Sequence, residues 1–160
     1  LRAAGKILGI DFVQFLGFVD VEIGNNDLAR LEKIITQKIR RFKPNIVLTF
    51  DLNGISGHLD HIAVSSAATQ AFNKTKIAKK IYYLTTLQNK TRRKQDYFIH
   101  RPDGRSRKEI DEIVDITPYW DTKLLAIQEH KSQIGDSSRL RKSWSKKPKK
   151  EYFIVRGIAR

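Results

Sequence analysis

The clearest hydrophobic pattern in the chain lies in residues 28–42, where apolar side chains recur at intervals of three and four residues. This spacing places them on one face of a helix, and basic side chains fill the opposite face. Pro44 follows and ends the helix, because proline cannot continue its backbone hydrogen bonding. The apolar positions are Leu28, Leu31, Ile34, Ile35, Ile39 and Phe42. The pattern predicts an amphipathic helix.

A short continuous apolar run, residues 46–50, follows this helix and predicts a strand buried on both faces. After a polar loop, residues 60–72 predict a second helix and residues 81–85 another strand. Strands and helices that alternate through short connections are typical of a parallel sheet with helices packed on it. We therefore predict an α/β fold, a Rossmann-like parallel sheet with helices on both faces. The inner residues of the second helix are predicted to be Ile62, Ala67, Ala68, Ala71 and Phe72.

The flanking segments contain weaker signals. They predict a strand at residues 12–18, a helix at residues 118–133, and a strand or a helix at residues 151–155. An Asp-Gly pair at 103–104 predicts a hairpin turn between residues 97–99 and 110–116.

Size and composition fit one globular domain of 160 residues, 40% hydrophobic and 30% charged, which excludes collagen-like and low-complexity chains. There is no cysteine, so disulfide frameworks, thiolate zinc sites and cysteine nucleophiles are excluded. No apolar run approaches the roughly 20 residues of a membrane span, and no signal-peptide pattern is present, so we expect a cytoplasmic protein. We expect residues 1–160 to form a single domain in which residues 137–150 are a basic, flexible segment.

The first nine residues resemble the last turns of a helix that ends at Gly9, with no capping residue before them. Residue 1 is leucine, and the chain contains no methionine. We therefore expect the chain to begin partway through a larger protein.

Two of the four histidines, His58 and His61, lie three residues apart with Asp60 between them. They follow the predicted buried strand and begin the second helix, which places them where open α/β sheets bind ligands. Neutral imidazole is a common zinc ligand, and a carboxylate can orient a neighbouring imidazole through its second nitrogen. The alternative is that the pair only satisfies hydrogen bonds where the loop meets the helix.

Residues 57–65, Gly-His-Leu-Asp-His-Ile-Ala-Val-Ser, resemble the second signature of the LmbE-like zinc deacetylases, whose usual form is Gly-His-Pro-Asp-His before a helix. This family includes the N-acetylglucosaminyl-phosphatidylinositol de-N-acetylases (PIG-L) and the deacetylases of mycothiol and bacillithiol synthesis. Residues 15–20 and 43–49 resemble further family segments in the same order. A late family helix is matched by Lys123, Ala126, His130, Ser132 and Gln133. The resemblance spans about residues 1–135.

The chain departs from the family pattern at two points. Leu59 replaces the usual proline, which removes no metal ligand. The first family signature, His-Pro-Asp-Asp-Glu, is absent from the chain. In the family it supplies two zinc ligands and the general base, and its place would be upstream of Leu1. We therefore expect a family member without its first strands, which binds zinc weakly or not at all and is inactive by itself.

The resemblance implies a Zn²⁺ site of two histidines and one carboxylate, with His61 as the third ligand and the others upstream of Leu1. In the complete protein, metal-bound water would attack the carbonyl of an N-acetyl group on an N-acetylglucosamine-type sugar conjugate. His58, protonated and oriented by Asp60, would stabilise the oxyanion or protonate the departing amine. The products would be acetate and a free amine. The family also forms oligomers, so a homo-oligomer is expected.

Four other polar residues have two interpretations each. Asp20 matches a position near the sugar pocket of the family and either binds substrate hydroxyls or is a turn residue. Asp51 and Asn53 either order the loop or touch substrate, and the pattern favours loop ordering; if one of them binds substrate, we expect it to be Asn53. For His130, the pattern favours a packed, hydrogen-bonded histidine on a helix.

The charge balance, 31 basic against 17 acidic residues, gives a net charge of +14. The excess is concentrated in residues 74–80, 90–94 and 139–150, and Trp144 lies in the last run. Basic side chains with an aromatic can bind phosphates and stack on a base, so the alternative function is a catalytically incomplete relative that binds nucleic acid or an anionic surface. A solvated surface, or a basic rim that steers an anionic substrate, also fits.

Overall fold

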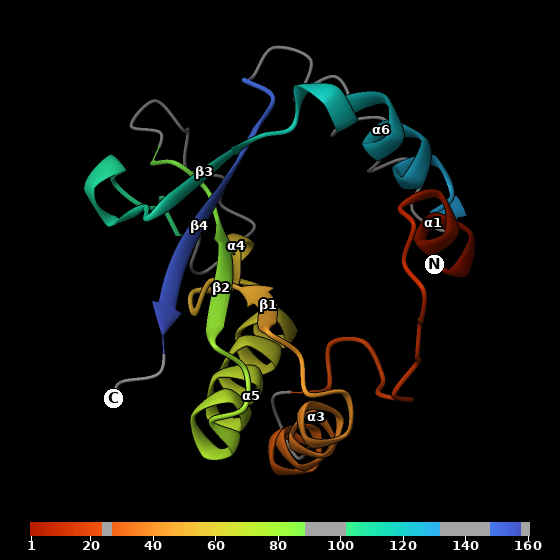
Figure 1. Cartoon of the computed structure of the whole chain (residues 1–160), viewed down its shortest axis with the longest axis vertical. Helices are drawn as coiled ribbons and strands as arrows, with labels where there is room; N and C mark the ends of the chain where they lie inside the picture. Colours follow the sequence, from red (N-terminus) through yellow and green to blue (C-terminus); the bar gives the residue numbers. More distant parts are fainter. Residues whose placement is uncertain (24–26, 89–101, 132–147, 158–160) are drawn as a thin grey trace. The chain divides into compact units, whose positions relative to one another are not determined.

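A computed structural model of the chain describes residues 1–23, 27–88, 102–131 and 148–157 (Figure 1). The chain divides into two compact units. Unit 1 consists of Leu1–Gly17 and Val114–Glu151, and unit 2 of Phe18–Ile113 and Tyr152–Arg160.

In unit 2, the amphipathic helix is confirmed as α3 (Leu28–Phe42). Leu31 and Ile39 on its apolar face are buried, whereas Phe42 in the last turn is 52% exposed. The helix ends at Lys43, whose φ of 46° takes the chain out of the helix just before Pro44. The end predicted from the proline is therefore the end observed.

The second helix, α5 (Leu59–Thr75), packs against α3 on one side and against the strands β1 and β2 on another (Figure 1). Because two sides are covered, its buried residues surround much of the helix instead of forming one stripe. Four of the five predicted inner residues are buried, and Ile62 is half-buried. The buried ones are Ala67, Ala68, Ala71 and Phe72.

The sheet has the order β1-β2-β4-β3, and its strands are β1 (Ile46–Phe50), β2 (Lys80–Thr85), β4 (Lys150–Gly157) and β3 (Glu112–Asp115). The strands β1 and β2 are parallel, as predicted, but β4 runs antiparallel to β2. The α/β class is thus confirmed and the sheet is mixed, not parallel throughout. An apolar segment indicates that a strand forms but does not indicate whether it runs parallel or antiparallel to its neighbour. The direction depends on the path of the connection that precedes the strand.

The strand β1 is not buried on both faces, so that prediction is wrong. Ile46 and Leu48 on one face are 53% and 64% exposed, whereas Thr49 on the other face is buried toward α5. The main cluster of buried side chains also lies on this inner side of the sheet. It consists of Phe72, Ala78, Ile81, Tyr83 and Ile154, with Val47 packed against it. In the part of the chain that the structure describes, helices therefore do not cover both faces of β1.

The strand predicted at residues 12–18 is not formed. Phe12 and Phe15 are 63% and 60% exposed, and the guanidinium of Arg2 lies 5.6 Å from the centre of the Phe15 ring. An aromatic segment becomes a strand only when a neighbouring strand accepts its backbone hydrogen bonds, and here the rings meet cations instead.

Unit 1 contains α1 (Arg2–Ile7), the 3₁₀ turn η2 (Thr117–Tyr119) and α6 (Trp120–Gln128). The helices α1 and α6 pack against each other. The predicted third helix is thus confirmed as a shorter one. Residues 97–99 and most of the predicted basic segment 137–150 lie outside the described residues. Across the described ranges, no helix is long and apolar enough to cross a membrane.

Candidate active site

The histidine loop begins where β1 ends, at the carboxyl edge of the sheet in unit 2. Asp51 continues the parallel pairing through its amide, which donates to the Leu84 carbonyl at 2.8 Å. The chain then turns back, because the Gly54 amide donates to the Asp51 carbonyl at 2.7 Å. The short helix α4 (Gly54–Gly57) follows, and His58 is the N-cap residue of α5. The predicted position of the pair at the end of a parallel strand is therefore confirmed.

His58 has its Nδ1 atom engaged by the backbone. The amide of Asp60 lies 3.2 Å from this nitrogen and can only donate, so Nδ1 accepts. In a neutral ring the proton must then lie on Nε2. His58 therefore caps α5 and presents an N–H donor at its outer nitrogen.

His61 has the opposite tautomer. Its Nδ1 lies 3.1 Å from the carbonyl oxygen of Gly54, which can only accept, so this nitrogen carries the proton. The Nε2 atom of His61 then holds a lone pair. Phe50 stacks on the His61 ring, with centroids 4.2 Å apart and an interplanar angle of 12°. The two imidazole centroids are 5.0 Å apart with an interplanar angle of 31°, so a ring with an Nε2 donor and a ring with an Nε2 lone pair are direct neighbours.

Asp60 is buried, with 5% of its surface exposed. Its Oδ2 accepts a 2.6 Å hydrogen bond from the amide of Val21, and its Oδ1 has no hydrogen-bond partner among the described residues. The contact with His58 comes from the Asp60 backbone, not from the carboxylate that was expected to orient this ring. The carboxylate instead connects the start of α5 to residues 20–22.

Of the predicted substrate residues, Asp20 is exposed and precedes Val21, the residue that Asp60 holds. Asn53 lies within the loop, where its side-chain oxygen accepts from the amide of Ile55 at 2.9 Å. This is the loop-ordering role that the sequence allowed for Asn53.

Asp51 is part of an ion pair that the sequence did not predict. The Nε and Nη2 atoms of Arg105 donate to its two carboxylate oxygens, each at 2.8 Å, and Thr85 Oγ1 donates at 2.7 Å. Asp51 is only 1% exposed. Burial acts to raise the pKa of Asp51, but the hydrogen bonds from Arg105 and Thr85 outweigh it and leave this pKa below its usual value. The same pairing raises the pKa of Arg105. Nothing in the basic stretch around Arg105 singles it out in the sequence.

His130 belongs to unit 1, where it is half-buried and follows α6. It lines a cavity of about 530 Å³ together with apolar side chains of α1 and α6 and the ion pair between Lys123 and Glu151. The packed role predicted for His130 is compatible with this position.

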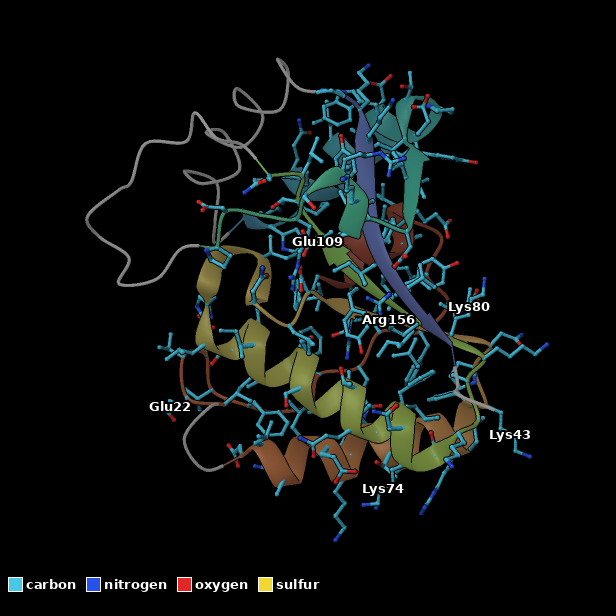
Figure 2. All side chains as sticks on the ribbon, turned by 90° about the vertical axis from the view of Figure 1, so that its left-hand side faces the viewer. Glu22, Lys43, Lys74, Lys80, Glu109 and Arg156 are labelled. Atoms are coloured by element: carbon cyan, nitrogen blue, oxygen red, sulfur yellow. The ribbon has the colours of Figure 1, made fainter. Side chains whose placement is uncertain are left out.

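Lysines from three segments lie at the amino end of β1 and β2. Lys43 and Lys76 end α3 and α5, each with a positive φ, and the amides of Lys79 and Lys80 both donate to the Asn45 carbonyl. Figure 2 shows Lys43 and Lys80 at one end of β2 and Glu109 at the other. The other two basic runs lie wholly or mostly outside the described residues.

A catalytic zinc ion usually takes three protein ligands. The described residues bring no three histidine, aspartate or glutamate side chains together in a way that could hold a metal ion. The lone pair of His61 fits one position of such a site.

Comparison with known families gives a match over residues 1–72 to the model described as PIG-L, GlcNAc-PI de-N-acetylase. Similar curated proteins include a 1D-myo-inositol 2-acetamido-2-deoxy-alpha-D-glucopyranoside deacetylase from Saccharomonospora viridis, 25% identical over 84% of this chain and 60% of that protein. The protein of the same name from Segniliparus rotundus is 28% identical over 81% of this chain and 50% of its own length. The chain thus spans between half and three-fifths of these relatives.

Among solved structures, the fold resembles GalB, the 4-carboxy-2-hydroxymuconate hydratase from Pseudomonas putida KT2440, with a TM-score of 0.52 and 18% identity. The match covers 96% of this chain and 68% of GalB, and at this identity it shows the fold alone. The matches with PIG-L and with the two deacetylases confirm the resemblance seen in the sequence. Residues 1–72 match the model of the PIG-L family of deacetylases, and the similarity to the curated deacetylases extends over more than four-fifths of the chain.

Proposed function

We propose that the complete protein is a zinc-dependent deacetylase that hydrolyses the N-acetyl group of an N-acetylglucosamine-type sugar conjugate. The family and the names of the relatives support this reaction class. The observation that carries the proposal is the opposite protonation of two adjacent imidazoles, His58 with Nε2–H and His61 with an Nε2 lone pair.

Amide hydrolysis needs a nucleophilic water, stabilisation of the oxyanion and a proton for the departing amine. A bound zinc ion supplies Lewis-acid polarisation and a more acidic water. His61 would hold the ion through Nε2. His58 would donate a hydrogen bond from Nε2–H to the oxyanion, and the proton for the amine nitrogen would come from the attacking water through the general base that the family resemblance implies. The adjacency of the two rings, whose centroids lie 5.0 Å apart, supports this division of roles.

Substrate contacts are assigned to two exposed or half-buried polar side chains. Asp20 would accept from sugar hydroxyls, at a place fixed by the hydrogen bond between Val21 and Asp60. Asn53 uses its side-chain oxygen within the loop, so its NH₂ group would be the part that meets substrate.

The test uses the complete protein and an inositol-linked N-acetylglucosamine, with release of free amine as the readout. We expect His61→Ala to abolish activity, and His58→Ala to lower kcat by about 10²- to 10³-fold, the usual effect of losing an oxyanion donor. Gln70→Ala, an exposed change on the same helix as His61, is the control and should leave activity unchanged. Full activity of the His61→Ala protein would overturn the proposal.

The convergence of Lys43, Lys76, Lys79 and Lys80 favours a second candidate, a module that binds polyanions. Such binding would weaken steeply with salt and survive His61→Ala, because it depends on released counterions and not on an imidazole. Binding of single-stranded RNA that is insensitive to Lys→Glu changes at these four positions would exclude it.

A further inference from the structure

Arg105 is fixed in place by its backbone as well as by its side chain. Its amide donates to the Thr86 carbonyl at 2.7 Å, and its carbonyl accepts from the Gln88 amide at 2.8 Å. Gly104 allows this approach, because its φ is 83° and a Cβ atom there would lie 2.6 Å from the Thr86 oxygen. The guanidinium therefore extends from a segment that is hydrogen-bonded to the residues just after β2.

The guanidinium fork reaches Asp51 with matched geometry. Two parallel N–H donors, each 2.8 Å from a different oxygen, fix the carboxylate in both position and rotation. Asp51 is almost fully buried, and an unpaired carboxylate in such a place is strongly disfavoured. The position of Asp51 thus depends on Arg105.

Asp51 in turn determines where the histidine loop turns. Its carbonyl accepts from the Gly54 amide at 2.7 Å, and the Gly54 carbonyl accepts from Nδ1 of His61 at 3.1 Å. Gly54 is tightly packed at this point. Its φ is 72°, and a Cβ atom there would lie 2.9 Å from the Ile62 side chain. A continuous set of short contacts therefore leads from the Arg105 guanidinium to the His61 ring.

We propose that Arg105 is a positioning residue for His61: through Asp51 it holds the Gly54 carbonyl at the place that keeps the proton on Nδ1 and the lone pair on Nε2. The benefit for catalysis rests on the function proposed above, in which this lone pair holds the metal ion. Hydrogen bonds that orient a ligand in this way usually affect metal affinity or activity by about 10- to 100-fold.

Glu109 offers a matched control. It also contacts Arg105, at 3.4 Å, and it is exposed in the short helix η1 (Arg107–Glu109). It has no link to the histidine loop among the described contacts. If Arg105 acts through Asp51, removal of the Glu109 charge should leave His61 unchanged.

The test measures the tautomer of His61 by ¹H–¹⁵N NMR of the histidine side chains in the 160-residue chain, above the pH at which imidazoles are protonated, without metal or substrate. His61→Ala assigns the signals. We expect wild type and Glu109→Gln to show a protonated Nδ1, and Arg105→Gln to show shifts averaged between the two tautomers. Arg105→Lys, which retains the charge and loses the fork, should lie between them.

A wild-type His61 with its proton on Nε2 would overturn the proposal without any variant, even if Arg105→Gln does not fold. Folded Arg105→Gln and Arg105→Lys proteins with the wild-type tautomer would also overturn it. The experiment contains no substrate, so its outcome is separate from the deacetylase assay. If the His61 proton is on Nδ1 and depends on Arg105, but the His61→Ala enzyme is active, the positioning role of Arg105 is supported and the proposed function is wrong.

Discussion

The amide of Val21 donates a 2.6 Å hydrogen bond to the carboxylate of Asp60, 39 residues further along the chain. Val21 has a φ of 72°, a conformation that a β-branched residue adopts only when its surroundings impose it. The hydrogen bond to Asp60 is the one contact of the Val21 amide that the described structure shows. The segment that contains Asp20 is thereby held at the start of the helix that contains His61.

Asp60→Ala should release this segment. We expect the Val21 amide to lose its protection from hydrogen exchange and the free energy of unfolding to fall by about 1.5–3 kcal/mol, since a hydrogen bond to a charged carboxylate is lost. Glu22→Ala, an exposed change at the next residue in the chain, which is labelled in Figure 2, should retain the protection. Equal protection in wild type and Asp60→Ala would contradict the role assigned to Asp60.

Asp51 should make stability depend on pH. Its pKa is lower in the folded chain than in the unfolded chain, so its contribution is fully present above the unfolded value of about 3.9 and is lost as the pH falls through the lower folded value. At pH 7, Asp51→Asn should cost about 1.5–3 kcal/mol, because the charge-assisted hydrogen bonds from Arg105 to the buried carboxylate are lost and Arg105 retains only its exposed contact with Glu109. Urea unfolding at several pH values between 7 and 3 measures this.

We expect the difference in the free energy of unfolding between wild type and Asp51→Asn to become smaller as the pH falls. Thr85→Val removes one hydrogen bond to Asp51 and retains the ion pair, so its curve should lie between the two. Parallel curves for all three proteins over this pH range would show that Asp51 is not the group responsible.

Gly54 and Gly17 provide a matched pair for the role of the tight loop. Their φ values are 72° and 74°, but a Cβ atom at Gly54 would meet the Ile62 side chain at 2.9 Å, whereas at Gly17 nothing lies within 4 Å. Gly17→Ala should lower the free energy of unfolding by about 1–2 kcal/mol, which is the strain of an alanine in the left-handed conformation. Gly54→Ala should cost more and should also disturb His61. Thermal unfolding of both variants compares them, and equal losses would contradict the tight contact.

Metal binding should separate the isolated chain from the complete protein. With His61 as the one ligand assigned here, we expect calorimetric titration of the 160-residue chain with zinc to show weak binding. Chelators should inactivate the complete protein, and zinc should restore it. Tight, stoichiometric zinc binding by the chain would show that it holds more ligands than we assign.

Local signals were sufficient to predict the helices α3 and α5, the parallel pair β1 and β2, and the place of the histidine pair. Helix periodicity, Pro44 and the Gly-His-Leu-Asp-His segment each act within a few residues of one another. The protonation of the two rings was not predictable, because it depends on which backbone group lies beside each nitrogen. The carboxylate of Asp60 was expected at His58 and instead meets Val21, from a turn far away in sequence.

Contacts between distant segments account for the other differences. The apolar sequence of β1 predicted burial on both faces, but one face is exposed. Exposure of a sheet face depends on which elements pack on it, and the sequence of the strand does not contain that information. The aromatic residues 12–18 have strand composition but no strand to pair with in the described structure. Arg105 lies in a polar, basic stretch, and only the folded chain shows that it meets Asp51.

The ion pair between Arg105 and Asp51 also bears on the order of events during synthesis. The partners are 54 residues apart, and chains are made at about 5–20 residues per second, so some 3–10 s pass between their addition. For the part of that interval after His61 has been added, the nascent chain contains both histidines but not the guanidinium that fixes their loop. The site is therefore one of the last parts of unit 2 to become rigid, after α5 has had time to form.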